Sequence, residues 1–145
     1  MRKTILAIAV LLAACDTASV PLATTQADTE GKKFGAPPSG EATLYVVRGG
    51  DVGTLINVTV GARSLGPLGN FTWFRVDMAP GTLDVRCAGG EASKSTTVTL
   101  SAGEVRFVET RATTGLWNSR CEIGEVPAPA GRDLVLRGKR AVELR

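Results

Sequence analysis

The feature that most constrains this fold is a series of short segments in which apolar and polar residues alternate. Residues 56–60 read INVTV, and the same period of two recurs in residues 74–78, 83–87 and 97–100. Successive side chains of a strand point to opposite faces, so this period predicts strands with one buried face. No such segment alternates with a long helical pattern, which argues against an α/β fold.

Glycine and proline turns separate the segments. Pro80 presets φ for a tight turn, and Gly81 can take the positive φ that such a turn requires. The loop 101–103 has three residues with glycine last, which predicts a hairpin between residues 97–100 and 105–107.

Further elements complete the pattern. Residues 42–48 and 116–123 are expected to be strands, whereas residues 132–137 are expected to form one or two helical turns. Many short strands with glycine and proline turns are typical of sandwiches and barrels. We therefore predict an all-β domain over residues 41–145, a small antiparallel β-sandwich of the immunoglobulin or transthyretin type.

Two cysteines share the inward positions of predicted strands. Cys87 continues the apolar set of Leu83 and Val85, and Cys121 lies on one face with Trp117 and Ile123. In an exported protein two such cysteines suggest one disulfide, with two separate buried thiols as the alternative. No Cys-x-x-Cys spacing is present, so a redox role is not expected.

The N-terminus has the pattern of an export signal. Arg2 and Lys3 precede an apolar run over residues 5–12, which is too short to span a bilayer. A basic start, a short apolar run and small residues are typical of a cleaved signal peptide, here residues 1–14. Without Arg2 and Lys3 the side-chain net charge falls from +3 to +1, so the basic precursor gives no reason to expect nucleic-acid binding.

Residues 12–15, Leu-Ala-Ala-Cys, resemble the lipobox of bacterial lipoproteins. The resemblance implies that Cys15 receives a diacylglyceryl group, that cleavage follows Ala14, and that the new N-terminus is acylated. An ordinary signal peptide with an incidental cysteine is the alternative. In enteric lipoproteins an aspartate after the cysteine resembles a signal for inner-membrane retention, so Asp16 favours that membrane without excluding the outer one.

The stretch between the anchor and the first strand is rich in Thr, Ala, Ser, Pro and Gly. Residues 15–40 are therefore expected to form the lipidated cysteine and a flexible linker.

Four segments of the predicted domain resemble PEGA-like β-sandwich domains and a related family of bacterial lipoproteins. They are residues 58–61, 65–68, 78–85 and 97–104, and the resemblance covers roughly residues 41–111. It implies a periplasmic accessory module and carries no catalytic residue. Ala79-Pro80-Gly81 stands where those domains have Pro-Glu-Gly-Ala.

The composition narrows the possible chemistry. The chain has no histidine, which removes Ser-His-Asp and Cys-His nucleophile systems and the commonest metal ligand. Asp77, Asp84, Glu104 and Glu109 alternate with apolar residues and are expected on solvated faces, although paired carboxylates remain the basis for a small hydrolase. We expect no catalytic activity, no cofactor and no metal.

The aromatic residues raise a different possibility. In the sequence Phe-Thr-Trp-Phe, Trp73 lies on the opposite strand face from Phe74, so Trp73 and Phe71 are a candidate binding patch. The alternative is that both faces of this strand are covered, with the C-terminal segment over Trp73. The basic residues Arg132, Arg137 and Lys139 are expected to be solvated, or else to contact anionic lipid or an acidic polymer.

These observations leave three functional hypotheses. The first is a lipid-anchored module of the bacterial envelope that faces the periplasm and binds another envelope protein. The second is a carbohydrate- or peptidoglycan-binding module that uses Trp73. The third is the small hydrolase.

The anchor can be tested directly. Replacing Cys15 with Ala removes the thiol that would carry the diacylglyceryl group. The protein should then leave the membrane fraction, because stable anchoring needs at least two acyl chains. Fractionation of cells after a salt wash measures this. An alanine variant that stays membrane-bound would contradict the anchor.

Overall fold

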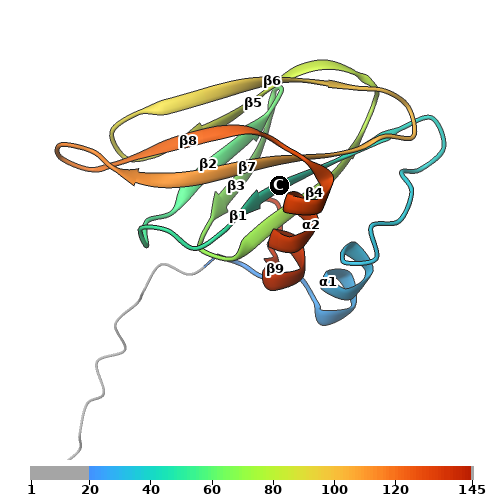
Figure 1. Ribbon diagram of the computed structural model, residues 1–145, viewed down its shortest axis with the longest axis horizontal. Coiled ribbons are helices and arrows are strands. Elements are labelled where there is room, and N and C mark those ends of the chain that lie inside the picture. Colours follow the sequence, from blue (N-terminus) through green and yellow to red (C-terminus); the bar gives the residue numbers. More distant parts are fainter. Residues whose placement is uncertain (1–19, 145) are drawn as a thin grey trace, which may run out of the picture.

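The computed structural model describes residues 20–144 and contains two β-sheets and two helices (Figure 1). One sheet has the order β8 (Ser119–Val126), β7 (Val105–Thr114), β1 (Ala42–Arg48), β4 (Thr72–Met78) and β9 (Lys139–Arg140). The other has the order β3 (Arg63–Leu68), β2 (Ile56–Val60), β5 (Gly81–Ala88) and β6 (Ser93–Leu100). The helices are α1 (Thr25–Gly31) and α2 (Ala128–Arg137). The expected signal peptide, Cys15 and Asp16 lie outside the described residues.

The main core lies between the two sheets. Leu44, Phe74 and Val108 of the five-stranded sheet pack in one cluster with Val58 and Val85 of the four-stranded sheet. All five side chains are fully buried. The alternating segments therefore give one buried face each, as predicted, and the mainly β, two-layered character of the domain is confirmed.

Strand β1 is buried along its whole length, unlike the alternating strands. Its inward residues enter the main core, while Tyr45 and Val47 join a second cluster with Trp73, Phe107 and Val135 of α2. The two helices cover the outer face of the five-stranded sheet (Figure 1). A strand buried on both faces gives a nearly continuous apolar run, which residues 42–48 have.

The five-stranded sheet is mixed, so the prediction of a wholly antiparallel fold is wrong. Strand β1 pairs in parallel with β7, and β4 pairs in parallel with β9. In the chain, β4 and all four strands of the other sheet lie between β1 and β7. No tight hairpin therefore fixes the relative direction of β1 and β7.

The predicted hairpin at residues 101–103 is also wrong. Strand β6 pairs with β5 in one sheet, whereas β7 pairs with β1 and β8 in the other, so this turn crosses between sheets. Gly103 has a positive φ of 81°, and its N–H donates to the carbonyl of Glu41 rather than to a strand partner. At the other turn, Gly81 has the expected positive φ.

Residues 20–40 are structured, which corrects the expectation of a flexible linker over this part of 15–40. Thr24 caps helix α1 by accepting a hydrogen bond from the N–H of Ala27. The hydroxyl of Tyr45 donates to the carbonyl of Gly31 at 2.7 Å, and Phe34 packs against Tyr45 and Phe107. This segment shows no alternation of apolar and polar residues, because it contacts the sheet through only a few separate residues.

The C-terminal segment fills the remaining side of the domain. Helix α2 begins after Pro127 and includes residues 132–137, for which one or two helical turns were expected. Residues 139–144 then run along β4, and the N–H of Ala141 donates to the carbonyl of Trp73. Farther on, the N–H of Leu144 donates to the carbonyl of Leu65 in the other sheet. This segment therefore ties the two sheets together.

Helix α1 is held to that segment by a buried carboxylate. Asp28 accepts hydrogen bonds from the N–H of Arg140 at 2.7 Å and pairs with Lys32 at 2.8 Å. Burial alone would raise the pKa of Asp28, but the hydrogen bonds from Lys32 and Arg140 outweigh it and hold the pKa below its usual value. A pKa depressed in the folded state stabilises the fold above the unfolded pKa, and this contribution is lost as the pH falls through the folded pKa.

Replacing Asp28 with Asn should lower the free energy of unfolding by about 1 kcal/mol at pH 7, because the amide keeps an acceptor but loses the charge. The difference from the wild type should begin to shrink below about pH 4, the ordinary carboxyl range of the unfolded chain, and should be lost once the pH falls through the depressed pKa of the folded Asp28. Denaturant unfolding between pH 7 and pH 3 measures this, with Asp133→Asn as the exposed control. A difference that stays constant with pH would rule out the ionised carboxylate as its source.

Candidate functional site

Trp73 cannot form the predicted binding patch, because its side chain is fully buried. A Cβ placed on Gly31 would overlap the Trp73 ring, and one placed on Gly138 would lie 3.1 Å from Trp73 Cδ1. The Arg140 guanidinium also lies 5.8 Å from the ring centroid. Helix α1 and the C-terminal segment therefore cover this strand face, and the alternative interpretation of Trp73 is the correct one.

Phe71, the other residue of that patch, is 43% exposed. It lies in the β3–β4 turn with a positive φ of 53°, and a Cβ on Gly50 would lie 2.7 Å from Phe71 Cζ. The structure therefore separates the two residues: Phe71 is on the surface at one end of the sandwich, and Trp73 is in the core.

The carboxylates that could have supported a hydrolase lie at the surface. Asp77 and Asp84 are exposed, while Glu109 pairs with Arg111 at 2.8 Å. Hydrogen bonds from the N–H of Ser101 and from Arg106 hold the pKa of Glu104 below its usual value. A carboxyl that stays ionised in this way is a poor proton donor at neutral pH.

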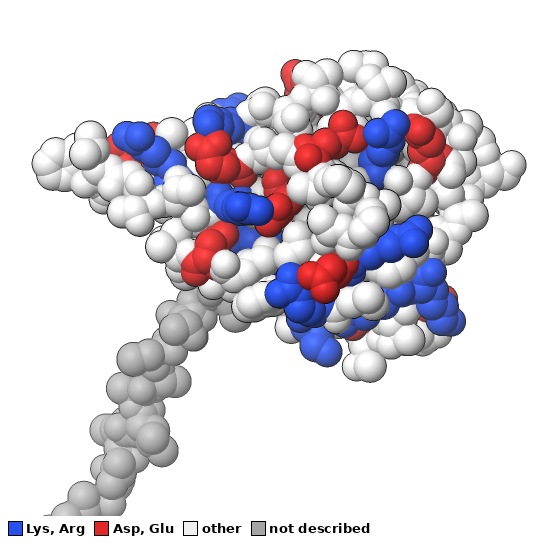
Figure 2. Space-filling view, viewed as in Figure 1, with Lys and Arg blue, Asp and Glu red and all other residues white. Residues whose placement is uncertain are grey.

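Basic side chains gather over the two helices at the lower right of Figure 2. Arg137 pairs with Asp133 at 2.6 Å, and Arg132 lies 5.2 Å from the ring centroid of Phe34. Arg132 therefore covers an aromatic ring, and Arg137 balances the charge of a neighbouring acid.

Within residues 20–144 no group of three or more His, Cys, Asp or Glu side chains is placed to hold a metal ion. In the same range no helix has the length and apolar character needed to cross a membrane.

The β7–β8 hairpin presents the most exposed large apolar side chains of the described domain. Leu116 is 82% exposed and Trp117 is 93% exposed, in the turn between the two strands. The expectation that Trp117 faces inward as part of a strand is therefore wrong. The signal that could have placed the turn is Gly115 followed by Asn118-Ser119, since these residue types favour turns.

The hairpin tip borders a hollow of about 310 Å³. Its other wall is the β1–β2 loop, which contributes Val52 and Thr54. On the face that Figure 2 shows, the outermost part of the hairpin is white, and the nearest charged side chains lie toward the body of the domain.

A buried arginine fixes the β1–β2 loop. The Arg48 guanidinium donates to the carbonyls of Thr54, Leu68 and Val52 and pairs with Asp51 at 2.5 Å. Asp51 in turn accepts a hydrogen bond from the N–H of Ala112 in β7. A buried charge needs this degree of hydrogen bonding to be tolerated, and the same bonds hold the loop beside the hairpin.

The disulfide between Cys87 and Cys121 holds the hairpin from the other side. It joins β5 to β8, across the two sheets, with a Cα–Cα distance of 6.2 Å. The predicted pairing is thus confirmed. The N–H of Glu91 also donates to the carbonyl of Ser119 at 2.8 Å. The base of the hairpin is therefore fixed, and its apolar tip projects from a rigid support.

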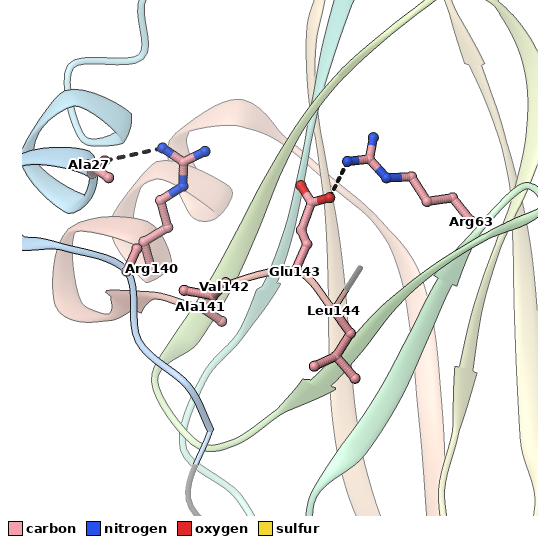
Figure 3. A pocket seen from close by; sticks show the side chains of 8 residues that line it. Ala27, Arg63, Arg140, Ala141, Val142, Glu143 and Leu144 are labelled. Carbon is pink, nitrogen blue, oxygen red and sulfur yellow. Dashed lines mark hydrogen bonds and ion pairs between the residues drawn. The ribbon is translucent and has the colours of Figure 1, made fainter.

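A second surface feature is a groove of about 520 Å³ between α1 and β3 (Figure 3). Its floor is the C-terminal segment 140–144. Figure 3 shows Arg140 turned toward Ala27 of α1, and Arg63 of β3 turned toward Glu143. Val142 and Leu144 lie between these charged groups, and both are exposed.

Comparisons with protein-family models, with curated protein sequences and with solved structures give no significant match to this chain.

Removing the disulfide should destabilise the domain and loosen the hairpin. Replacing Cys87 and Cys121 with Ser should lower the free energy of unfolding by roughly 3–4 kcal/mol, because the bond closes a loop of 34 residues. Denaturant unfolding measures the change. A thiol assay on denatured, unreduced Cys15→Ala protein should find no reactive thiol, and two reactive thiols would contradict the bond.

Proposed function

We propose that this chain is a lipid-anchored accessory protein of the bacterial cell envelope, which binds another envelope protein and catalyses no reaction. Its anchor is Cys15, and its folded domain faces the periplasm. In this proposal the domain is a β-sandwich of the immunoglobulin or transthyretin type, related to PEGA-like modules. Asp16 favours the inner membrane.

The export part of the proposal is supported by the disulfide. Disulfides form and persist in oxidising compartments such as the periplasm and are rare in the cytosol. Cys87 and Cys121 are both buried and bonded, which leaves Cys15 as the one cysteine available for lipid.

The groove between α1 and β3 is the observation that carries the protein-binding proposal. It combines exposed apolar side chains, Val142 and Leu144, with a charged rim of Arg63, Glu143 and Arg140. Protein interfaces have this anatomy: an apolar centre surrounded by polar and charged groups, with arginine enriched. Arg63 and Glu143 pair with each other, whereas Arg140 has backbone and aromatic contacts, so the rim carries a net positive charge. We therefore propose that the partner contributes a segment with an acidic group.

Val142→Glu tests the groove without disturbing the core, because Val142 is 44% exposed. The matched control is Leu136→Glu in α2, at a residue that is 56% exposed and lies outside the groove. Crosslinking in intact cells followed by detergent extraction should recover a reproducible envelope protein with the wild type and the control. Recovery with Val142→Glu should fall about tenfold or more, as for loss of one central interface residue.

Equal recovery with both variants would show that the groove is not the binding site. If cell-wall fragments were recovered in place of a protein, the carbohydrate-binding hypothesis would replace this one, although without Trp73 as its binding residue.

A further inference from the structure

The exposed large apolar side chains of the loops between strands are distributed unequally over the described domain. Val52, Phe71, Leu116 and Trp117 lie in the β1–β2, β3–β4 and β7–β8 connections. The strand pairing places these connections at one end of the sandwich, since Arg48 pairs with Thr72 and β7 runs parallel to β1. At the opposite end, the β2–β3, β4–β5 and β6–β7 turns expose only small or polar residues such as Pro80 and Ser101.

The chain enters the described domain at this same apolar end. A Cβ on Gly69 would lie 3.2 Å from Val20 Cγ2 and 3.6 Å from Leu55 Cδ2, so Val20 lies beside the β3–β4 turn and the β1–β2 loop. In Figure 1 the described chain begins below the β1–β2 loop, on the side where the β7–β8 hairpin projects.

We infer that this end of the sandwich is a membrane-contact surface, in which Leu116 and Trp117 enter the interfacial region of the bilayer beside the lipid anchor. The inference rests on the lipidation of Cys15 in the proposed function. Five residues of chain from Cys15 to Val20 reach at most about 18 Å when fully extended. An acylated Cys15 therefore holds Val20, and the apolar end beside it, close to the bilayer.

The chemistry of the hairpin tip suits a bilayer interface. Tryptophan is enriched at membrane–water interfaces, where its ring lies at the headgroup level, and leucine gains from burial at the acyl boundary. The rigid base of the hairpin, with its disulfide and the Arg48–Asp51 pair, lowers the entropy lost when the tip is immobilised. Carrying its apolar residues at the anchored end distinguishes this tip from the groove, which lies along the side of the domain.

The test places the mature chain on vesicles by chemical means. Purified without lipid, the chain from Cys15 onward has one free thiol, because Cys87 and Cys121 are bonded. That thiol is coupled to a maleimide lipid in phosphatidylethanolamine–phosphatidylglycerol vesicles, with or without bromine on the acyl chains. Because coupling replaces cellular lipidation, this test and the Cys15→Ala fractionation can fail independently.

The two tryptophans report separately. A Trp73→Phe variant leaves only Trp117, and a Trp117→Phe variant leaves only the buried Trp73. The Trp117 emission should shift to shorter wavelength on vesicles and be quenched by the brominated chains, while the Trp73 emission should not change. If Trp73→Phe does not fold, the wild-type spectrum minus that of Trp117→Phe gives the Trp117 signal.

A partition measurement on uncoupled protein adds a second readout. Leu116→Ser should weaken vesicle binding about tenfold, the loss expected for one buried leucine. The matched control is Leu144→Ser in the groove, which should leave vesicle binding unchanged.

Three results would overturn the inference. The first is Trp117 emission that brominated acyl chains do not quench and that aqueous iodide still quenches. The second is protection of Trp117 that depends only on protein concentration, which would indicate a second copy of the chain. The third is protection that requires an added envelope protein, which would make the tip a protein-binding site.

Discussion

Strand β1 has to be covered on both faces, and the rest of the structure depends on that constraint. Its inner face enters the core between the sheets, and its outer face carries Tyr45 and Val47. Without α1 and α2, an aromatic cluster of Tyr45, Trp73 and Phe107 would lie in water. The Tyr45 hydroxyl then bonds to the carbonyl of Gly31, which fixes the helix that covers it.

The same need explains how both ends of the chain are held. The N-terminal segment pairs with the C-terminal one, through Leu22 and Ala141, and the C-terminal segment reaches across to Leu65 in the other sheet. On the opposite side the Cys87–Cys121 bond and the Lys94–Glu122 pair join the sheets. A domain tied on both sides holds two surface features in fixed positions: the loops at the end where the described chain begins, and the lateral groove.

Sequence reasoning succeeded where a local pattern carried the information and failed where distant segments meet. The alternation in residues 56–60, 74–78 and 83–87 gave correct buried faces, and the positive φ of Gly81 followed from the turn chemistry. For Trp73 the sequence left both an exposed and a covered position open, because its cover comes from residues 31 and 138, far away in the chain. Trp117 was wrongly assigned to a strand because the alternation of polar and apolar residues continues from β8 back into the turn.

The sequence by itself determined the buried faces of the alternating strands, the tight turn at Pro80-Gly81 and the inward position of two cysteines, because period and turn residue types are local properties. It also supplied the lipobox pattern on which the proposed anchor depends. Only the tertiary structure decided which aromatic residues are exposed, which strands run in parallel, and which loops share one end with the start of the domain. Those properties depend on contacts between residues far apart in the chain, and the free energy of burying a side chain is set by whatever segment covers it.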